Sequence, residues 1–144
     1  MGCCLKTSIQ GRVLNPGTAK GEPVYFDEPL SFWGGFDADR GMVIDKQHPQ
    51  YGVVITGRVL VMPGSRGSAG TPGVLAETLR LKTGPIGIIL DKQDINVTTG
   101  AQVISELYGW HCPVVSLTQI AFSELNKARR VTISENGTVT LEMD

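Results

Sequence analysis

The chain has 144 residues, 41% of them hydrophobic, and a formal net charge of −1 at pH 7. This size and composition are typical of one globular domain that buries its own core, so we expect residues 1–144 to form a single domain. The charge balance gives no basic face for nucleic acid, and no apolar run approaches the roughly 20 residues that a membrane span needs. Since no signal-peptide pattern opens the chain either, we expect a cytoplasmic protein that binds neither nucleic acid nor a membrane.

The three cysteines, Cys3, Cys4 and Cys112, have neither the even count of a disulfide framework nor the spacing of a metal site. Cys112 comes just before an apparent buried strand, so we interpret it as a core thiol. We therefore expect no complete metal site within this chain.

The first half of the chain has the pattern of glycine-punctuated β structure, in which β-branched and apolar runs end at Gly, Pro or Asn. A long irregular segment, residues 27–41, interrupts these runs. The strands expected here are residues 5–14, 23–26, 42–44 and 53–62.

The second half alternates strands with helices. The apolar runs 86–90 and 114–117 flank a helix that opens with a capping box at Thr99 and stops at Gly109, so we expect a βαβ unit with parallel strands. The residues expected on the buried face of this helix are Ala101, Ile104, Leu107 and Tyr108. The elements expected after it are a short helix at 119–127 and a hairpin of strands 130–133 and 138–141 around an Asn136-Gly137 turn.

The most informative stretch is the glycine- and serine-rich loop between the strand that ends at Met62 and a helix that ends before Gly84. Thr71 followed by Pro72 suits the N-cap and the first position of that helix. A loop in this place directs backbone N–H groups and the positive end of the helix dipole at a ligand above it. The residues on this loop that could hold an anion or present a hydroxyl are Ser65, Arg66, Gly67 and Ser68.

Two interpretations of this loop stay open from the residues alone. The hydroxyl of Ser68 could act as a base or nucleophile if backbone N–H groups or Arg66 assist it, or Ser68 could simply cap the helix. Arg66 could clamp a carboxylate or phosphate, or it could be a solvated loop charge.

A second candidate segment contains two adjacent aromatics followed by two glycines, Ser31-Phe32-Trp33-Gly34-Gly35. Aromatic side chains in a loop either cover the core or are buried against a partner or ligand. The nearby acids Asp37, Asp39 and Asp45 are typical of turns, and the isolated His48 and His111 are interpreted as structural.

Several of these motifs, taken in order, resemble the small subunit of aconitase X-type dehydratases. They are Ser31 to Gly35, Asp45 to Pro49, Gly52, the strand 57–60 and Arg66-Gly67-Ser68, and the resemblance extends from about Gly11 to Pro113. It implies an α/β fold, a swivelling β/β/α domain similar to the swivel domain of aconitase, with a barrel-like β core and flanking helices.

The resemblance also implies roles for the two candidate segments. Ser68 matches the proposed catalytic base of that family, and the residues implied in substrate binding are Arg66, Gly67 and Ser65. The residues implied in contact with the partner or the pocket are Ser31, Phe32, Trp33 and Gly34.

The implied activity is that of a hydro-lyase subunit, active only with a large aconitase X-type subunit that holds iron or an iron–sulfur cluster. Iron would act as a Lewis acid on a small hydroxy acid, while Ser68 removes the α-proton and domain closure excludes water. Ala69-Gly70-Thr71 replaces the run of serines common in the family, and no second cation accompanies Arg66. This pattern favours dehydration of cis-3-hydroxy-L-proline to 1-pyrroline-2-carboxylate, with phosphomevalonate as the alternative substrate.

Two functions of other classes remain as alternatives. A phosphohistidine-type swivel carrier would need an exposed histidine on a glycine-rich loop, where this chain has Ser68, while His48 and His111 lie elsewhere. A non-catalytic interaction domain would retain the fold but not depend on Ser68.

Overall fold

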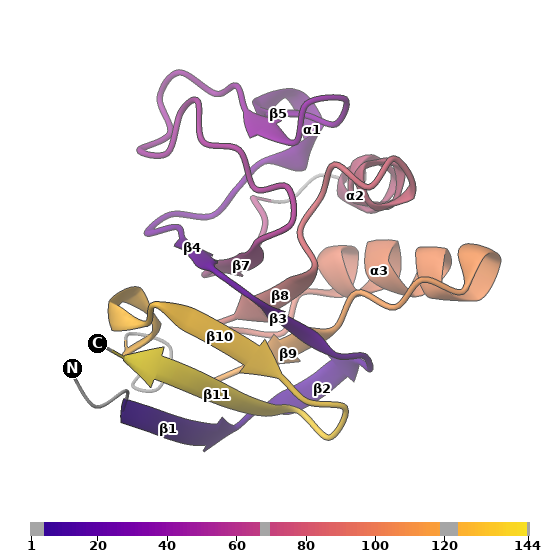
Figure 1. Ribbon diagram of the computed structural model, residues 1–144. Helices are drawn as coiled ribbons and strands as arrows, with labels where there is room; N and C mark the ends of the chain where they lie inside the picture. The colour runs from indigo at the N-terminus through magenta and orange to yellow at the C-terminus, as the bar shows by residue number, and fades with distance from the viewer. Residues whose placement is uncertain (1–4, 67–69, 119–123, 144) are drawn as a thin grey trace.

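The computed structural model describes residues 5–66, 70–118 and 124–143 (Figure 1). The strands are β1 (Leu5–Gln10), β2 (Arg12–Asn15), β3 (Ala19–Gly21), β4 (Pro23–Tyr25), β5 (Phe36–Asp37), β6 (Met42–Val43), β7 (Val59–Met62), β8 (Gly87–Leu90), β9 (Val114–Ser116), β10 (Arg130–Ile133) and β11 (Thr138–Met143). The helices are α1 (Phe32–Gly35), α2 (Thr71–Arg80), α3 (Ile95–Tyr108) and the 3-10 helix η1 (Glu124–Lys127). None of the helices in these ranges has the length and apolarity that crossing a bilayer requires.

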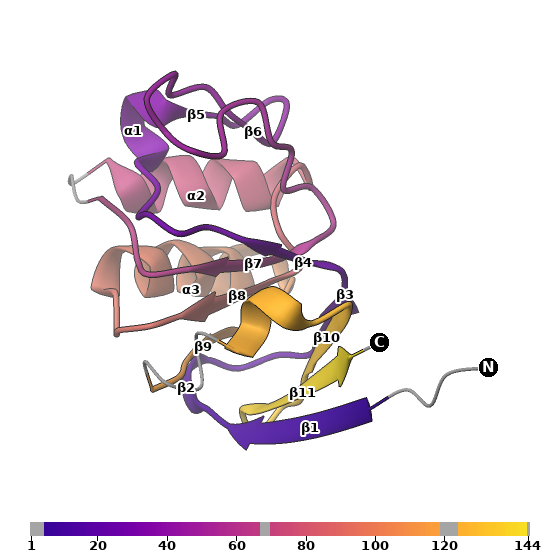
Figure 2. The same ribbon diagram turned by 90° about the vertical axis from the view of Figure 1, so that its left-hand side faces the viewer.

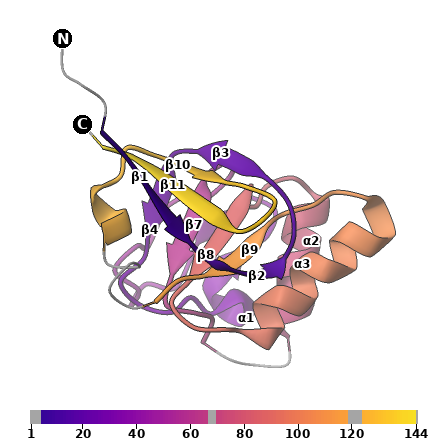
Figure 3. The same ribbon diagram turned by 90° about the horizontal axis from the view of Figure 1, so that it is seen from below.

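The two larger sheets are stacked, with α2 and α3 on one outer side (Figures 1 and 2), and β5 and β6 form a separate two-stranded ladder. A four-stranded antiparallel sheet has the order β1-β11-β10-β3, and a five-stranded sheet has the order β2-β9-β8-β7-β4. In the second sheet β4, β7, β8 and β9 run parallel, and β2 is antiparallel to β9. Figure 3 looks onto the four-stranded sheet, with the parallel strands behind it. This is the expected β/β/α layering, and the ladders within the described ranges form open sheets without closing a barrel.

The middle strands of the five-stranded sheet are buried on both faces. Val59 and Val61 of β7 pack toward β10 and β11, whereas Leu60 and Met62 pack toward α2 and α3. Strand β8 repeats the pattern, and both strands are fully buried. Such two-sided burial explains why these strands are continuous apolar runs rather than alternating ones.

Two of the strands predicted from the sequence are longer than a single strand of the structure. The segment 5–14 is two strands, because the chain leaves one sheet for the other at Gly11, whose N–H donates to the Gly137 carbonyl at 3.0 Å. A side chain at Gly11 would place its Cβ 2.9 Å from that oxygen. The segment 53–62 is a strand only from Val59, because Gly57 adopts a left-handed φ of 71° and turns the chain.

Helix α3 begins earlier than expected and exposes part of the face that was expected to be buried. Its N-cap is Asp94, so Thr99 lies inside the helix rather than at its start. Ala101 and Ile104 are buried, but Leu107 and Tyr108 are 70% and 60% exposed. The expected stop is confirmed, since Gly109 adopts a left-handed φ of 66°.

The remaining expectations for the second half hold where the residues are described. Strands β8 and β9 are the parallel pair of a βαβ unit, and β10 and β11 form the hairpin with Gly137 at φ 89° in its turn. Of the helix expected at 119–127, residues 119–123 lie outside the described ranges, and η1 covers the rest. Strand β6 confirms the strand expected at 42–44, whereas its partner strand β5, strand β3 and the irregular turn α1 were not expected.

Burial makes the Cys112 thiol inert. It is fully buried, and this burial raises the pKa of the Cys112 thiol from 9.0 to about 12. We expect iodoacetamide at pH 8.5 to label Cys112 in urea but not in the native protein, as measured by peptide mass mapping. Native labelling at the rate of a free thiol would contradict the assignment.

The raised pKa of the Cys112 thiol also has a consequence for stability. Since only the unfolded thiol ionises between pH 9 and 12, this group should lower the free energy of unfolding as the pH rises through that window.

The turn between β5 and β6 depends on a glycine that admits no side chain. Gly41 has a φ of 64°, and a Cβ there would overlap the Thr83 carbonyl oxygen and the Thr56 hydroxyl. We expect Gly41→Ala to lower the free energy of unfolding by about 2–5 kcal/mol. Gly52→Ala is the matched control, because Gly52 has a φ of 86° but open space around it, so only the backbone cost of about 1–2 kcal/mol applies. Equal losses in urea titrations of the two variants would be the contrary result.

Candidate functional site

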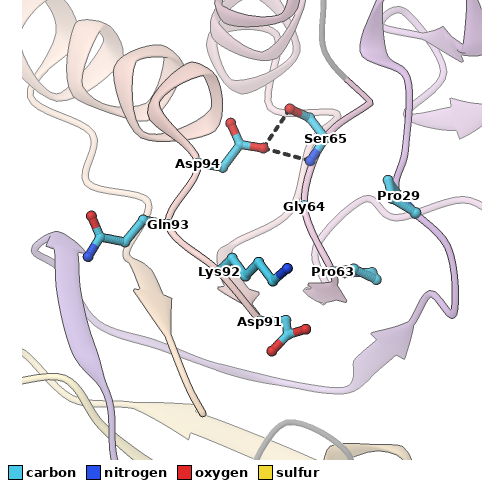
Figure 4. Close-up of a pocket in the computed structure, with 8 residues that line it drawn as sticks. All are labelled: Pro29, Pro63, Gly64, Ser65, Asp91, Lys92, Gln93 and Asp94. Carbon is cyan, nitrogen blue, oxygen red and sulfur yellow. Dashed lines mark hydrogen bonds between the residues drawn. The ribbon is translucent and has the colours of Figure 1, made fainter. Parts of the chain in front are cut away.

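A cavity of about 320 Å³ lies at the carboxyl ends of β7 and β8 (Figure 4). Parallel strands bring their carboxyl ends to one edge of a sheet, which is where α/β proteins bind their ligands. The residues lining the cavity are Pro29, then Pro63, Gly64 and Ser65 after β7, and Asp91, Lys92, Gln93 and Asp94 after β8.

One carboxylate connects the two strand ends. Oδ2 of Asp94 accepts hydrogen bonds from both the N–H and the hydroxyl of Ser65, each at 2.7 Å (Figure 4). Its Oδ1 accepts from the N–H groups of Asn96 at 3.0 Å and Val97 at 3.2 Å, and so caps α3. Asp94 was not predicted, although an aspartate directly before an apolar helix is an N-cap signal. Because the Ser65 hydroxyl donates its hydrogen bond to Asp94, it can contact a ligand only as an acceptor, through its oxygen.

The loop after β7 is also fixed from the side of residues 28–31. The N–H of Arg66 donates to the Leu30 carbonyl at 2.9 Å, and the N–H of Leu30 donates to the Gly64 carbonyl at 3.3 Å. Leu30 is fully buried, so this contact is anchored in the core. The loop therefore has a defined course as far as Arg66.

Two cations lie at this edge of the sheet. Nη2 of Arg66 is 3.6 Å from Oε1 of Glu28, with side chains 59% and 49% exposed. Such an exposed ion pair is worth about 0–1 kcal/mol, so a ligand anion could replace Glu28 at little cost. Lys92 lines the cavity and extends toward Pro63 (Figure 4). Lys92 was not singled out in the sequence, because only the fold brings the two loops to one edge.

The aromatic segment lies against the far end of the same loop. Phe32 is fully buried and packs edge-on against Phe36 with ring centroids 5.4 Å apart. Trp33 is 66% exposed and covers Gly70, where an added Cβ would come within 3.0 Å of its indole ring. The structure thus divides the pair into one core residue and one residue beside the loop, and it brings together the two segments that the sequence indicated.

The other residues of the aromatic segment shape the backbone around Trp33. The Ser31 hydroxyl donates to the Trp33 carbonyl at 2.8 Å, and Gly34 has a left-handed φ of 84°. Neither makes a contact that identifies a ligand, so their implied contact with the partner or pocket stays a prediction.

The centre of the loop, including the predicted Gly67 and Ser68, lies outside the described residues. The expected N-cap is displaced by one residue. Gly70 occupies the N-cap position of α2, while Thr71 turns into the core and is fully buried. Within the described part of the chain the Thr71 hydroxyl has no hydrogen-bond partner.

The acids near the aromatic segment serve turns, as expected. Oδ1 of Asp37 accepts from the N–H groups of Asp39 and Arg40 at 3.0 and 3.3 Å. Oδ1 of Asp45 accepts from the N–H of Gln47 at 2.9 Å. These bonds are the side-chain-to-backbone contacts typical of Asx turns.

His48 is a structural residue. It is 6% exposed, and its ring packs against Phe26. Nδ1 accepts from the N–H of Gln50 at 3.0 Å, so Nε2 carries the proton and faces the Glu28 carbonyl at 3.3 Å. A buried ring with both nitrogens engaged does not suit a phosphohistidine carrier, and the exposed His111 lies on the segment before β9 rather than on the serine loop.

The residues at this edge do not fit a metal centre. Across the described ranges, no three His, Cys, Asp or Glu side chains gather closely enough to hold a metal ion. Asp91 and Asp94 share the cavity, but both oxygens of Asp94 already accept two hydrogen bonds each.

The β/β/α layering with a loop and cavity at the carboxyl edge of the parallel sheet defines a swivel-type domain. The model of one family, described as the aconitase X swivel domain, matches residues 8–141, so the chain belongs to that family. The resemblance seen in the sequence is thereby confirmed.

The chain is similar to named dehydratases of two kinds. It is 38% identical to a cis-3-hydroxy-L-proline dehydratase of Hypocrea jecorina over 86% of its own length, but it spans only 21% of that relative, about a fifth. It is 32% identical to the phosphomevalonate dehydratase small subunit of Pyrococcus furiosus, over 92% of this chain and 94% of that one. The crystal structure of Thermococcus kodakaraensis aconitase X in its holo-form superposes with a TM-score of 0.79 at 28% identity, covering 96% of this chain and 99% of that one.

The contact between Trp33 and Gly70 can be tested by one added methyl group. We expect Gly70→Ala to push the indole off the loop by a few tenths of an ångström and to shift the Trp33 side-chain N–H signal in NMR spectra. Gly73, the third residue of α2, is exposed and has open space around it, so Gly73→Ala is the control. It should leave that signal in place and stabilise the helix by roughly 0.5–1 kcal/mol. An unchanged Trp33 signal in Gly70→Ala would show that the two residues do not touch.

Proposed function

We propose that this chain is the small subunit of a hydro-lyase that removes water from a small hydroxy acid. The observation that carries the proposal is the position of the loop after β7, which borders a cavity at the carboxyl edge of the parallel sheet and is fixed there at Ser65 and Arg66. Membership of the aconitase X swivel domain family and similarity to two kinds of dehydratase support the reaction class.

In this proposal Ser68 is the general base that removes the α-proton of the substrate. A serine hydroxyl needs assistance for this task, and the candidates are the N–H groups at the start of α2 and the Arg66 guanidinium. Arg66 and Lys92 would bind the carboxylate of the substrate. Gly67 would let the backbone approach the ligand, and Ser65 would contribute its hydroxyl oxygen as an acceptor.

The rest of the active site would lie on a large aconitase X-type subunit, or on a further part of a longer chain. Relatives about four times as long, beside a small subunit of matching length, support this division. Since the described residues do not fit a metal centre, we assign the iron or iron–sulfur cluster to that partner. The exposed indole of Trp33, beside the loop, is the contact we assign to the partner or the closed pocket, together with the Ser31 to Gly34 turn.

We favour cis-3-hydroxy-L-proline as the substrate because two hydroxyproline dehydratases are 38% and 40% identical over 86% and 81% of this chain. Phosphomevalonate dehydratase small subunits reach 39% only over 65% of it, and 32% over 92%. Phosphomevalonate is the second candidate, and two observations favour it. The phosphomevalonate dehydratase small subunit matches this chain in length, and Lys92 supplies a second cation for a phosphate at the same edge as Arg66. Assays of the assembled enzyme with both compounds decide between them.

The test of the proposal is Ser68→Ala in the complex with the large subunit. We expect its kcat to fall by about 10²–10⁴-fold, the range for loss of a general base, with complex formation unchanged in gel filtration. Ser8→Ala is the control, because Ser8 is an exposed serine of β1 that contacts the Thr140 hydroxyl of the neighbouring strand β11, in the four-stranded sheet and not in the sheet that borders the cavity. Full activity of Ser68→Ala would refute a catalytic role and favour a non-catalytic interaction domain.

A further inference from the structure

The loop that follows β7 returns to the core at the start of α2, and its two ends are both attached to α3. At the far end, a Cβ added to Gly100 of α3 would lie 3.0 Å from the Pro72 carbonyl oxygen and 3.1 Å from Leu75. This close approach leaves α3 in direct contact with the first turns of α2. The end of the loop at Thr71 is therefore positioned by the packing of two helices.

At the near end the attachment is the carboxylate of Asp94. Backbone contacts with Leu30 hold the loop from one side only. Asp94 holds it from the side of α3, through two hydrogen bonds of 2.7 Å from Ser65. Hydrogen bonds to an ionised acceptor are shorter and roughly twice as strong as neutral ones. Because they engage the N–H and the hydroxyl of one residue, they fix both its backbone and its rotamer.

The same carboxylate fixes where α3 begins. Its second oxygen caps the helix at Asn96 and Val97, so the 14-residue helix and the loop share a single side chain as their junction. Each carboxylate oxygen of Asp94 already accepts two hydrogen bonds, which argues against Asp94 acting as a base on a ligand. Its place in the cavity wall is that of a support rather than of a reacting group.

We propose that Asp94 is a positioning residue for the serine loop, which it ties to the start of α3 through Ser65. This inference deepens the proposed function and rests on it, since the residue positioned is the proposed base, Ser68. Both ends of the loop are then held by contacts with one helix, α3. This matters for the reaction rate, because misplacement of a reacting group by about 1 Å can cost about 10²-fold in rate.

The test is Asp94→Asn in the complex with the large subunit, assayed with cis-3-hydroxy-L-proline and phosphomevalonate. Asparagine is as good an N-cap as aspartate, so α3 is retained. When its one oxygen caps the helix, its NH₂ group faces Ser65, so the Ser65 N–H loses its acceptor and the hydroxyl can bond only as an acceptor, which weakens the attachment. We expect kcat to fall about 10–100-fold, with KM within about threefold and the unfolding temperature little changed.

A second variant separates positioning from folding. Asp94→Ser keeps a capping hydroxyl but is too short to reach Ser65, so it should reproduce the fall in kcat. Asp39→Asn removes the same charge from an exposed turn and should leave kcat unchanged. Wild-type kcat in both Asp94 variants would overturn the proposal, as would a fall in kcat that follows the loss of folded protein measured by circular dichroism.

The two proposals fail in different ways. If Ser68→Ala is inactive while both Asp94 variants have wild-type kcat, the positioning role is wrong and the proposed function stands. If Ser68→Ala is fully active, the proposed function is wrong, and the role of Asp94 falls with it.

Discussion

The structure depends on the burial of β7 and β8 on both faces. Residues 59–62 and 87–90 lie between the four-stranded sheet and the helices, and every one of them is buried. A polar side chain on either strand would have to be buried without solvent, at a cost of several kcal/mol if unpaired. Polar groups therefore emerge where the strands end, and the two loops that follow them carry the serine, the lysine and the acids of the cavity.

This arrangement also explains why a single aspartate has so large a part in the site. The parallel neighbours β7 and β8 end at the same edge of the sheet. Asp94, which follows β8 and caps α3, therefore lies next to Ser65, which follows β7. Asp94 can then satisfy donors from Ser65 and from the start of α3 with one side chain. From the other side the segment 28–33 provides backbone bonds and the Trp33 indole, so the loop is held between two parts of the chain that are distant in sequence.

What the sequence predicted well were features with a local physical cause. The apolar runs of β8 and β9, the glycine stop of α3 and the Asn136-Gly137 hairpin were all placed correctly, because burial and left-handed turns leave a clear mark on residue type. Errors arose where two local signals competed. Val53 to Ile55 look like the start of a strand, but the left-handed turn at Gly57 separates them from β7.

The candidate site shows the same limit. The loop and the aromatic segment were both indicated by their composition, but their contact at Trp33 and Gly70 was not, since nothing in either segment specifies the other. Asp94 was missed because the capping box at Thr99 offered a competing helix start, and Lys92 because its relation to Arg66 exists only after the sheet forms. The proposed role of Ser68 as the base rests on the family resemblance, since the residues around it left a catalytic role and a capping role both open.

The proposed function is tested most sharply by a reconstitution assay that compares this chain alone, the proposed large subunit alone and the two together. Release of water from cis-3-hydroxy-L-proline or phosphomevalonate is followed in each case, along with the iron content of each component. We expect dehydration only by the mixture, with iron in the large subunit. Dehydration by this chain alone, or no reaction of either substrate with the assembled, iron-loaded pair, would contradict it.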